Sequence, residues 1–212
     1  MVLVGAFVPV ALAARHGVPP VDVSITRALQ AIVVQPFGAV LTRVSDFGFS
    51  PLSQLTYATS LAGLWLAGRP RSGILVVAAA ALGSAAVALL KNVIDRPRPS
   101  STLVHVAARL HDDGFPSGHV VHYVVMFGLV IYIVEAQRLL PPPVRAAFVV
   151  LLGGLIILVG PSRVYLGEHW PSDALGGYLL GGAVLLTAIA VERRLNEGAS
   201  SSFSRLTLRK HR

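Results

Sequence analysis

The sequence contains no cysteine and little charge. Of its 212 residues, 13% are Asp, Glu, Lys or Arg, while 54% are hydrophobic. The absence of cysteine excludes disulfides and thiolate metal sites, which leaves histidine and carboxylate as the reactive groups. A soluble domain needs more charge and less apolar surface than this, so the composition predicts a membrane protein.

Long apolar runs are what the sequence has instead of charge. A transmembrane helix needs about 20 mostly apolar residues. We expect six spans, in the ranges 1–14, 51–67, 73–90, 120–134, 144–160 and 174–191. The expected fold class is therefore all-α: an integral membrane six-helix bundle forming one domain over 1–197. A basic, Ser-rich tail follows at 198–212.

Two parts of this layout allow another interpretation. The run 1–14 resembles a secretory signal, but no basic region precedes its apolar part, so a first span is favoured. Residues 15–50 mix prolines and polar residues with spaced apolar ones, which predicts interfacial amphipathic segments between the first two spans. We expect these segments either to cover a site and touch a lipid substrate, or to form a plain linker.

Acidic residues are scarcer than basic ones, 10 against 18, so the net charge is +8. With six spans, ten basic residues lie on the side of the termini and eight on the other. The contrast becomes ten to five when Lys91, Arg98 and Arg163, which belong to polar motifs, are set aside. By the positive-inside rule the tail is cytoplasmic and the motifs face the extracytoplasmic side. The basic residues form no folded basic face, so their expected partner is the lipid bilayer and not nucleic acid.

Two polar clusters interrupt the apolar pattern around the loop after the third span. The stretch "KNVIDRPRP" runs from Lys91 through Arg98 to Pro99. By itself it fits basic residues that reach from a span end to the headgroups. The stretch "FPSGH" comes directly before the fourth span. There, Ser117 and the free amides of a helix start, including that of Gly118, favour an anion, and His119 lies in the same turn.

A third cluster, "SRVYLGEHWPSD", separates the fifth and sixth spans. The planar fork of Arg163 matches two phosphate oxygens at once. His169 and Asp173 are four residues apart, so their side chains meet if a helix begins near Pro171. A carboxylate on one ring nitrogen fixes the histidine tautomer and leaves the other nitrogen free as a base or nucleophile.

Together these clusters resemble the signature of the type 2 phosphatidic acid phosphatase superfamily, which also contains vanadium haloperoxidases and class A acid phosphatases. That signature consists of lysine, six residues and Arg-Pro; then Pro-Ser-Gly-His; then Ser-Arg, five residues, His, three residues and Asp. The chain matches all three parts in order and at full spacing, between Lys91 and Asp173.

The resemblance implies a two-step phosphoryl transfer with no metal and no cofactor. His169 would attack phosphorus, Asp173 would hold its imidazole, and His119 would protonate the leaving group. The phosphate oxygens would be held by Lys91, Arg98, Ser117, Gly118 and Arg163, with Ser162 in support.

The expected function is hydrolysis of a membrane lipid phosphate by a multi-pass protein of a bacterial cell membrane. Undecaprenyl or another polyprenyl diphosphate is favoured as substrate, and phosphatidic acid and phosphatidylglycerol phosphate are also compatible. Two alternatives stay open: a phosphotransferase that uses the same histidine, and a non-catalytic lipid-phosphate binder or transporter. The membrane spans argue against a haloperoxidase.

Other polar residues near the motifs receive plainer predictions. His122 is expected to be a satisfied polar residue facing the bundle, and Asp112 to be solvated near the site's entrance. Arg96 is expected to pair with Asp95 or with headgroups, and Trp170 to lie in an interfacial aromatic belt. Glu168, beside the expected nucleophile, is a weaker candidate for tuning its pKa.

Overall fold

The protein, described by a computed structural model over residues 2–108, 110 and 112–210 (side chains to 197), is built from eight helices. They are α1 (Val2–Arg15), α2 (Pro20–Gln30), α3 (Phe37–Asp46), α4 (Leu52–Leu66), α5 (Pro70–Ile94), α6 (Gly118–Ala136), α7 (Pro142–Tyr165) and α8 (Pro171–Lys210). These ranges contain no strand, which confirms the all-helical prediction.

Four helices are long and apolar enough to cross a membrane: α5, α6, α7 and the Pro171–Glu197 part of α8. A fifth span is reached if α1 and α2, bent by 95° from each other, are counted together. Two of the six expected spans, 1–14 and 51–67, form helices of only 14 and 15 residues. The structure thus supports four to five spans, and the count of six stays a prediction.

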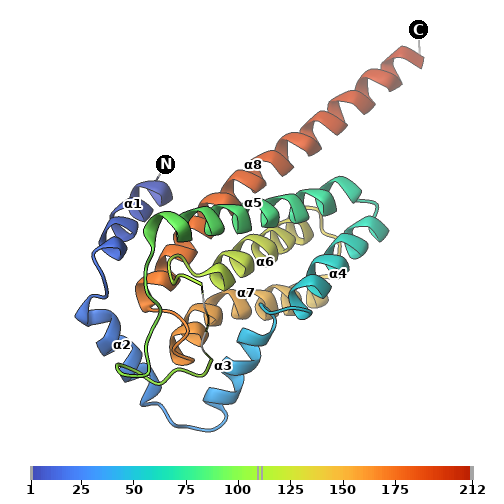
Figure 1. Cartoon of the computed structure of the whole chain (residues 1–212). Coiled ribbons are helices and arrows are strands. Elements are labelled where there is room, and N and C mark those ends of the chain that lie inside the picture. Colours follow the sequence, from blue (N-terminus) through green and yellow to red (C-terminus); the bar gives the residue numbers. More distant parts are fainter. Residues whose placement is uncertain (1, 109, 111, 211–212) are drawn as a thin grey trace.

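The core is built around α6, which packs against α5, α7 and α8 (Figure 1). Eleven of its 19 residues are buried, among them Tyr123, Leu129 and Ile133. Because α6 is apolar on all sides, it fits the centre of a bundle, where every face meets another helix.

Helices α5 and α7 end, and α6 and α8 begin, where the sequence interrupts the helical pattern. At the end of α5, Asp95 adopts the left-handed conformation (φ 49°), and Pro97 and Pro99 lack the N–H that a helix needs. The helix α8 begins at Pro171, as the sequence predicts, because proline suits the first turn. The breaks between α5 and α6 and between α7 and α8 therefore bring all three polar motifs to one end of the bundle.

The irregular stretch 15–50 forms two short helices at the same end. The helix α3 packs on α7, and α2 touches both α7 and α8. The Ser162 hydroxyl donates to the Leu41 carbonyl oxygen (2.7 Å), and the Tyr123 hydroxyl donates to that of Val44. These buried bonds tie α3 to the motif-bearing helices, so this stretch is more than a plain linker.

Candidate active site

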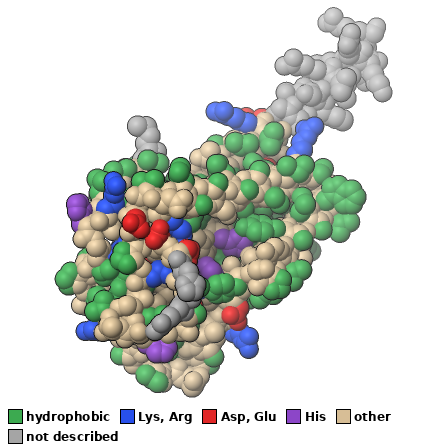
Figure 2. All heavy atoms as spheres, in the orientation of Figure 1, with side chains coloured by type: hydrophobic (Ala, Val, Ile, Leu, Met, Phe, Trp, Pro, Cys, Tyr) green, Lys and Arg blue, Asp and Glu red, His purple; other side chains and the backbone are tan. Residues whose placement is uncertain are grey.

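A pocket of about 510 Å³ lies where the motifs converge. Figure 2 shows basic, acidic and histidine side chains gathered around a hollow on an otherwise largely hydrophobic face. Six of the eight predicted site residues line it: Lys91, Arg98, Gly118, His119, Arg163 and His169. The other two, Ser117 and Asp173, are fully buried. The structure thus brings residues from α5, α6 and α7, and from the loops after α5 and before α8, to one cavity.

His169 is buried and held between an acid and a cation. Its Nδ1 lies 3.5 Å from Asp173 Oδ2, and its Nε2 lies 3.1 Å from a guanidinium nitrogen of Arg98. Burial, followed by the charges of Arg98 and Arg163, lowers the pKa of His169 well below its ordinary value. The imidazole is therefore neutral at pH 7, with Nε2 directed toward the cationic side of the pocket.

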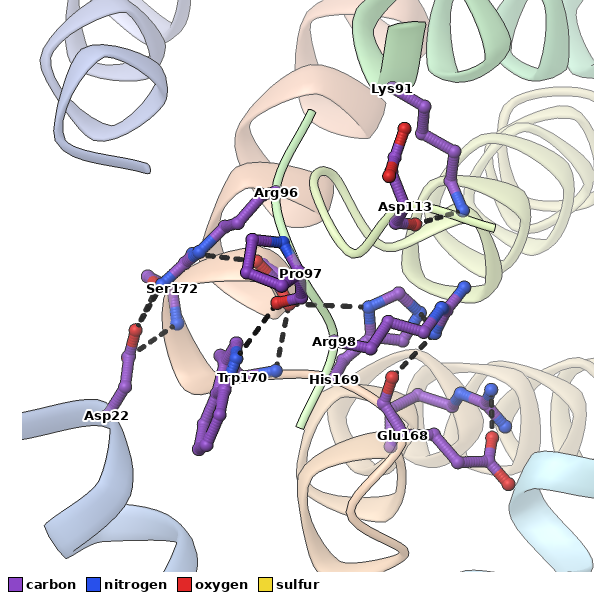
Figure 3. Close-up of polar contacts among 12 residues, drawn as sticks. Asp22, Lys91, Arg96, Pro97, Arg98, Asp113, Glu168, His169, Trp170 and Ser172 are labelled. Atoms are coloured by element: carbon purple, nitrogen blue, oxygen red, sulfur yellow. Dashed lines mark hydrogen bonds and ion pairs between the residues drawn. The ribbon is translucent and has the colours of Figure 1, made fainter. Parts of the chain in front are cut away.

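Asp173 is fixed by a buried ion-pair network, of which Figure 3 labels Arg96, Asp22 and Ser172. Its Oδ2 accepts the backbone N–H of Trp170 (2.9 Å), and its Oδ1 accepts Arg96 (2.7 Å). The other end of that guanidinium donates to Asp22 of α2 (2.7 Å), which also accepts the Ser172 backbone N–H (3.0 Å). Arg96 and Asp173 have no exposed surface, so Asp173 is held from both sides before any ligand arrives.

This network corrects two predictions. Arg96 pairs with Asp22 and Asp173, and not with Asp95 or headgroups. The left-handed turn at Asp95 marks the end of α5, after which Arg96 runs into the protein interior. Trp170 is likewise fully buried, and its indole N–H donates to the Pro97 carbonyl (3.2 Å), so it is not part of an interfacial belt.

The two cations of the first motif already bind an anion. Lys91 pairs with the carboxylate of Asp112, and Arg98 donates to the same carboxylate at 2.8 Å. Burial opposes ionisation of Asp112, but the bonds to Lys91 and Arg98 outweigh it, so the pKa of Asp112 is lowered. The side chain of Asp112 is 59% exposed, as expected for a solvated residue near the entrance, and it also pairs with both cations, which was not predicted.

Arg163 is buried in a polar and aromatic setting. It pairs with Glu168, donates to the Ser45 hydroxyl, and lies 5.0 Å from the ring centre of Phe49. Burial raises the pKa of Glu168, against the opposing charges of Arg163 and Arg98. The Glu168 carboxylate therefore pairs with Arg163 and does not contact His169, while the Glu168 carbonyl oxygen accepts Arg98 at 2.5 Å.

His119 faces the pocket with an unused nitrogen. Its Nε2 and the Ser117 hydroxyl are both buried and have no partner among the described residues. The ring of Phe49 packs edge-on against His119 at 4.4 Å between centroids. A Cβ on Gly48 would lie 2.0 Å from the same imidazole, so only glycine fits at that position. The segment after α3 therefore shapes the surroundings of His119.

Sequence reasoning missed Asp22, Ser45, Gly48 and Phe49, which reach the site from α2, α3 and the turn after α3. No spacing rule connects them with the motifs, because Asp22 and Ser172 are 150 residues apart. The one available signal was an acid and prolines in a stretch expected to be interfacial. The role predicted for Ser162 fails as well, since its hydroxyl is bound to Leu41 and not to the pocket.

No described group of three or more histidine, cysteine or acidic side chains is placed to hold a metal ion. His111 and residue 109 lie outside the described residues. A mechanism without metal thus stays a prediction, and the groups available to an anion are the cations and amides named above.

Comparisons with known proteins agree with this architecture. The chain is 28% identical over 168 residues to phosphatidylglycerophosphatase B of Bacillus subtilis, covering 78% of this chain and 80% of that one. It is 32% identical over 82 residues to undecaprenyl-diphosphatase of Sulfolobus acidocaldarius, covering 38% of this chain and 34% of that relative.

A solved structure shares the fold. The transmembrane PAP2-type phosphatidylglycerolphosphate phosphatase from Bacillus subtilis superposes with a TM-score of 0.78 at 24% identity, over 91% of this chain and 94% of that one. The PAP2 superfamily matches residues 72–197, which include all eight predicted site residues. The chain therefore belongs to the PAP2 superfamily.

Proposed function

We propose that this protein hydrolyses the phosphate of a membrane lipid through a phosphohistidine formed on His169. One observation carries the proposal: the two nitrogens of this imidazole face opposite partners. Nδ1 faces Asp173 and Nε2 faces Arg98 in the cation-lined pocket. Because a guanidinium can only donate, Nε2 accepts from Arg98 and therefore carries the lone pair. A bound phosphoryl group that takes Arg98 onto its own oxygens would free this lone pair for attack.

The first chemical step forms the N–P bond. Nε2 of His169 attacks phosphorus while the bond from phosphorus to the leaving oxygen breaks, and His119 gives that oxygen a proton. Asp173 stabilises the positive charge that develops on the imidazole. In the second step a water attacks phosphorus, its proton passes to His119, and the N–P bond breaks. Phosphate leaves, and both histidines return to their starting states.

The cations stabilise the charge of the transferred group. Lys91, Arg98 and Arg163, with the hydroxyl of Ser117 and the amide of Gly118, would hold its oxygens. The carboxylate of Asp112 supports this assignment, because Lys91 and Arg98 bind its oxygens in the absence of substrate. Neutralisation by fixed cations replaces what a metal ion does in other phosphatases.

The proposed contacts are all with the phosphate and not with the lipid tail. We therefore assign the substrate from the chemistry of the phosphate and from the relatives. We favour a polyprenyl diphosphate such as undecaprenyl diphosphate, and phosphatidylglycerol phosphate and phosphatidic acid fit the same phosphate site. The relatives named for phosphatidylglycerophosphate and undecaprenyl diphosphate support these choices.

We place the site on the extracytoplasmic side of a bacterial cell membrane, because the termini side carries more basic residues. The absence of native cysteine permits a direct test with Ser101→Cys in the site-side loop and Ala136→Cys at the other end of α6. An impermeant maleimide added to intact cells should label only the first. Labelling of only the second would reverse the orientation.

The test of the reaction is phosphate release by the detergent-purified protein with EDTA present, from the three lipid phosphates. We expect release by the parent protein and by His105→Ala, a matched control in an exposed loop, and none above background by His169→Ala. Parent-rate release by His169→Ala would refute the phosphohistidine route. Phosphate appearing only on an added alcohol would identify a transferase, and substrate binding without turnover a binder.

A further inference from the structure

The pocket continues beyond the phosphate-binding cations toward the middle of α5. Along α5 it is lined from Lys91 to Ser84, which is two helical turns or about 10 Å. We call this continuation the inner half of the pocket. Its lining residues are Ser53 and Tyr57 of α4, Ser84, Val87 and Ala88 of α5, and His122 of α6. Figure 1 shows α4 and α5 beside each other, with α6 next to α5.

The inner half contains a polar pair that the proposed chemistry does not use. The hydroxyl of Tyr57 and Nδ1 of His122 share a hydrogen bond, and their rings meet edge-on with centroids 4.9 Å apart. Nε2 of His122 is buried and has no partner within the described part of the chain. The prediction that His122 is a satisfied polar residue is therefore only half right.

Counting protons shows what the pair can offer. A neutral imidazole has one N–H and Tyr57 has one O–H, so the pair has two protons and uses one of them internally. If Tyr57 donates to Nδ1, the free proton is on Nε2; if Nδ1 donates to Tyr57, the free proton is on the hydroxyl. In both arrangements the pair keeps one donor for a ligand.

A purely structural link between α4 and α6 does not account for that free donor. Leaving a buried donor unpaired is unfavourable, and an apolar contact would join the two helices without it. The neighbouring Nε2 of His119 is in the same condition, buried and unpartnered, and it is the atom that must reach the leaving oxygen. Both histidines line the pocket with a buried Nε2 whose hydrogen bond a bound ligand would supply.

We propose that the His122–Tyr57 pair binds a second phosphoryl group of the substrate, on the leaving-group side of the phosphate that is cleaved. The proposal rests on the proposed function, because it takes His119 as the leaving-group acid. His122 lies three residues deeper on α6, about 4.5 Å along the axis, where the next few bonds of the leaving group would lie.

The kind of acceptor follows from the donors around it. Ser53 and Ser84 line the same inner half as the pair, and the Ser53 hydroxyl, which donates to Gln54 at 3.3 Å, can turn to a ligand instead, so α4, α5 and α6 all offer donors. Several donors suit an oxyanion with more than one oxygen, and bonds to charged acceptors are the stronger ones. A prenyl monophosphate presents only carbon there. The substrate class is thus a lipid diphosphate, or a lipid whose terminal phosphate is joined through a short bridge to a phosphodiester.

The experiment compares substrates that share a tail. Farnesyl diphosphate and farnesyl monophosphate form one pair, and phosphatidylglycerol phosphate and phosphatidic acid form the other. For His122→Phe and Tyr57→Phe, kcat/KM on the bis-phosphoryl member of at least one pair should fall about tenfold, with less than about a twofold change on its partner. Thr56→Val is the matched control: it removes a neighbouring α4 hydroxyl that contacts Met126 and does not line the pocket.

Loss confined to the first pair identifies a diphosphate, and loss confined to the second identifies the bridged phosphodiester. Equal losses on both members of each pair, or no loss on any, would overturn the proposal. Binding of farnesyl diphosphate to His169→Ala, with and without His122→Phe, needs no turnover. If His122→Phe weakens this binding about tenfold but the unmodified protein releases no phosphate, the proposed function fails and the second-phosphoryl site stands. If His122→Phe leaves the binding unchanged, the second-phosphoryl site is overturned.

Discussion

The two histidines of the pocket differ in what holds the groups beside them. On the His169 side, Asp173 accepts Arg96 and the Trp170 amide, and Arg96 is fixed in turn by Asp22, while His169 Nδ1 lies 3.5 Å from Asp173 without a hydrogen bond among the described residues. On the acid side, His119 Nε2 and the Ser117 hydroxyl are buried without partners in the described residues. The first side is fixed in advance, which lowers the reorganisation needed to reach the transition state. The second side presents groups whose bonding a substrate would complete.

The largest expected effect comes from breaking the fixed side. Asp173→Asn should lower kcat by about a thousandfold with little change in KM, because the amide favours the wrong imidazole tautomer while leaving the cations in place. Steady-state phosphate release measures both constants. Asp46→Asn is the control, because neither Asp46 nor its exposed partner Arg43 lines the pocket. A loss smaller than tenfold for Asp173→Asn would show that this carboxylate is not the residue that orients His169.

A smaller loss is expected when the fixed side is loosened from a distance. Asp22→Asn removes one of the two carboxylates that hold Arg96, so Asp173 becomes less well positioned; we expect kcat to fall about tenfold at unchanged KM. Ser24→Ala, on the same helix, removes only a local bond to the Pro20 carbonyl and should have no effect. If Asp22→Asn raised KM instead and left kcat unchanged, α2 would act on substrate binding and not on the nucleophile.

The smallest effect concerns the ligand-binding cations. Asp112→Asn should lower KM a few-fold at constant kcat, because the carboxylate competes with substrate phosphate for Lys91 and Arg98. The Asp112 side chain is 59% exposed, so solvent screening limits how far KM falls. Since the pKa of Asp112 is lowered, the competing charge is present at neutral pH and is lost only as pH falls through that lowered pKa. KM measured at pH 7 for parent and variant tests this, and a higher KM in the variant would mean that Asp112 assists binding.

The sequence was sufficient for the residues that motif spacing connects. The meeting of His169 with Asp173 follows from a helix that begins at Pro171, and the convergence of Lys91, His119 and Arg163 follows from long apolar helices that alternate in direction. These features depend on local periodicity and on span length, which a single sequence displays directly.

The residues that support the site could not be predicted in this way. Contacts of Asp22 with α8, and of Phe49 with α6 and α7, depend on how short helices fold back over the bundle. No periodic pattern encodes such long-range packing. The span count of six exceeds the four to five that the described helices support for a related reason: α1 and α4 are apolar, but each is shorter than a bilayer requires.

The central claim, a covalent phosphohistidine on His169, is tested most directly by trapping it. The protein would be mixed with substrate, quenched within milliseconds in alkali, where phosphohistidine survives, and digested for mass spectrometry. We predict one added phosphoryl group on the peptide that contains His169, absent from His169→Ala. Steady turnover with no phosphoryl group on that peptide, or with the group on another residue, would contradict the account.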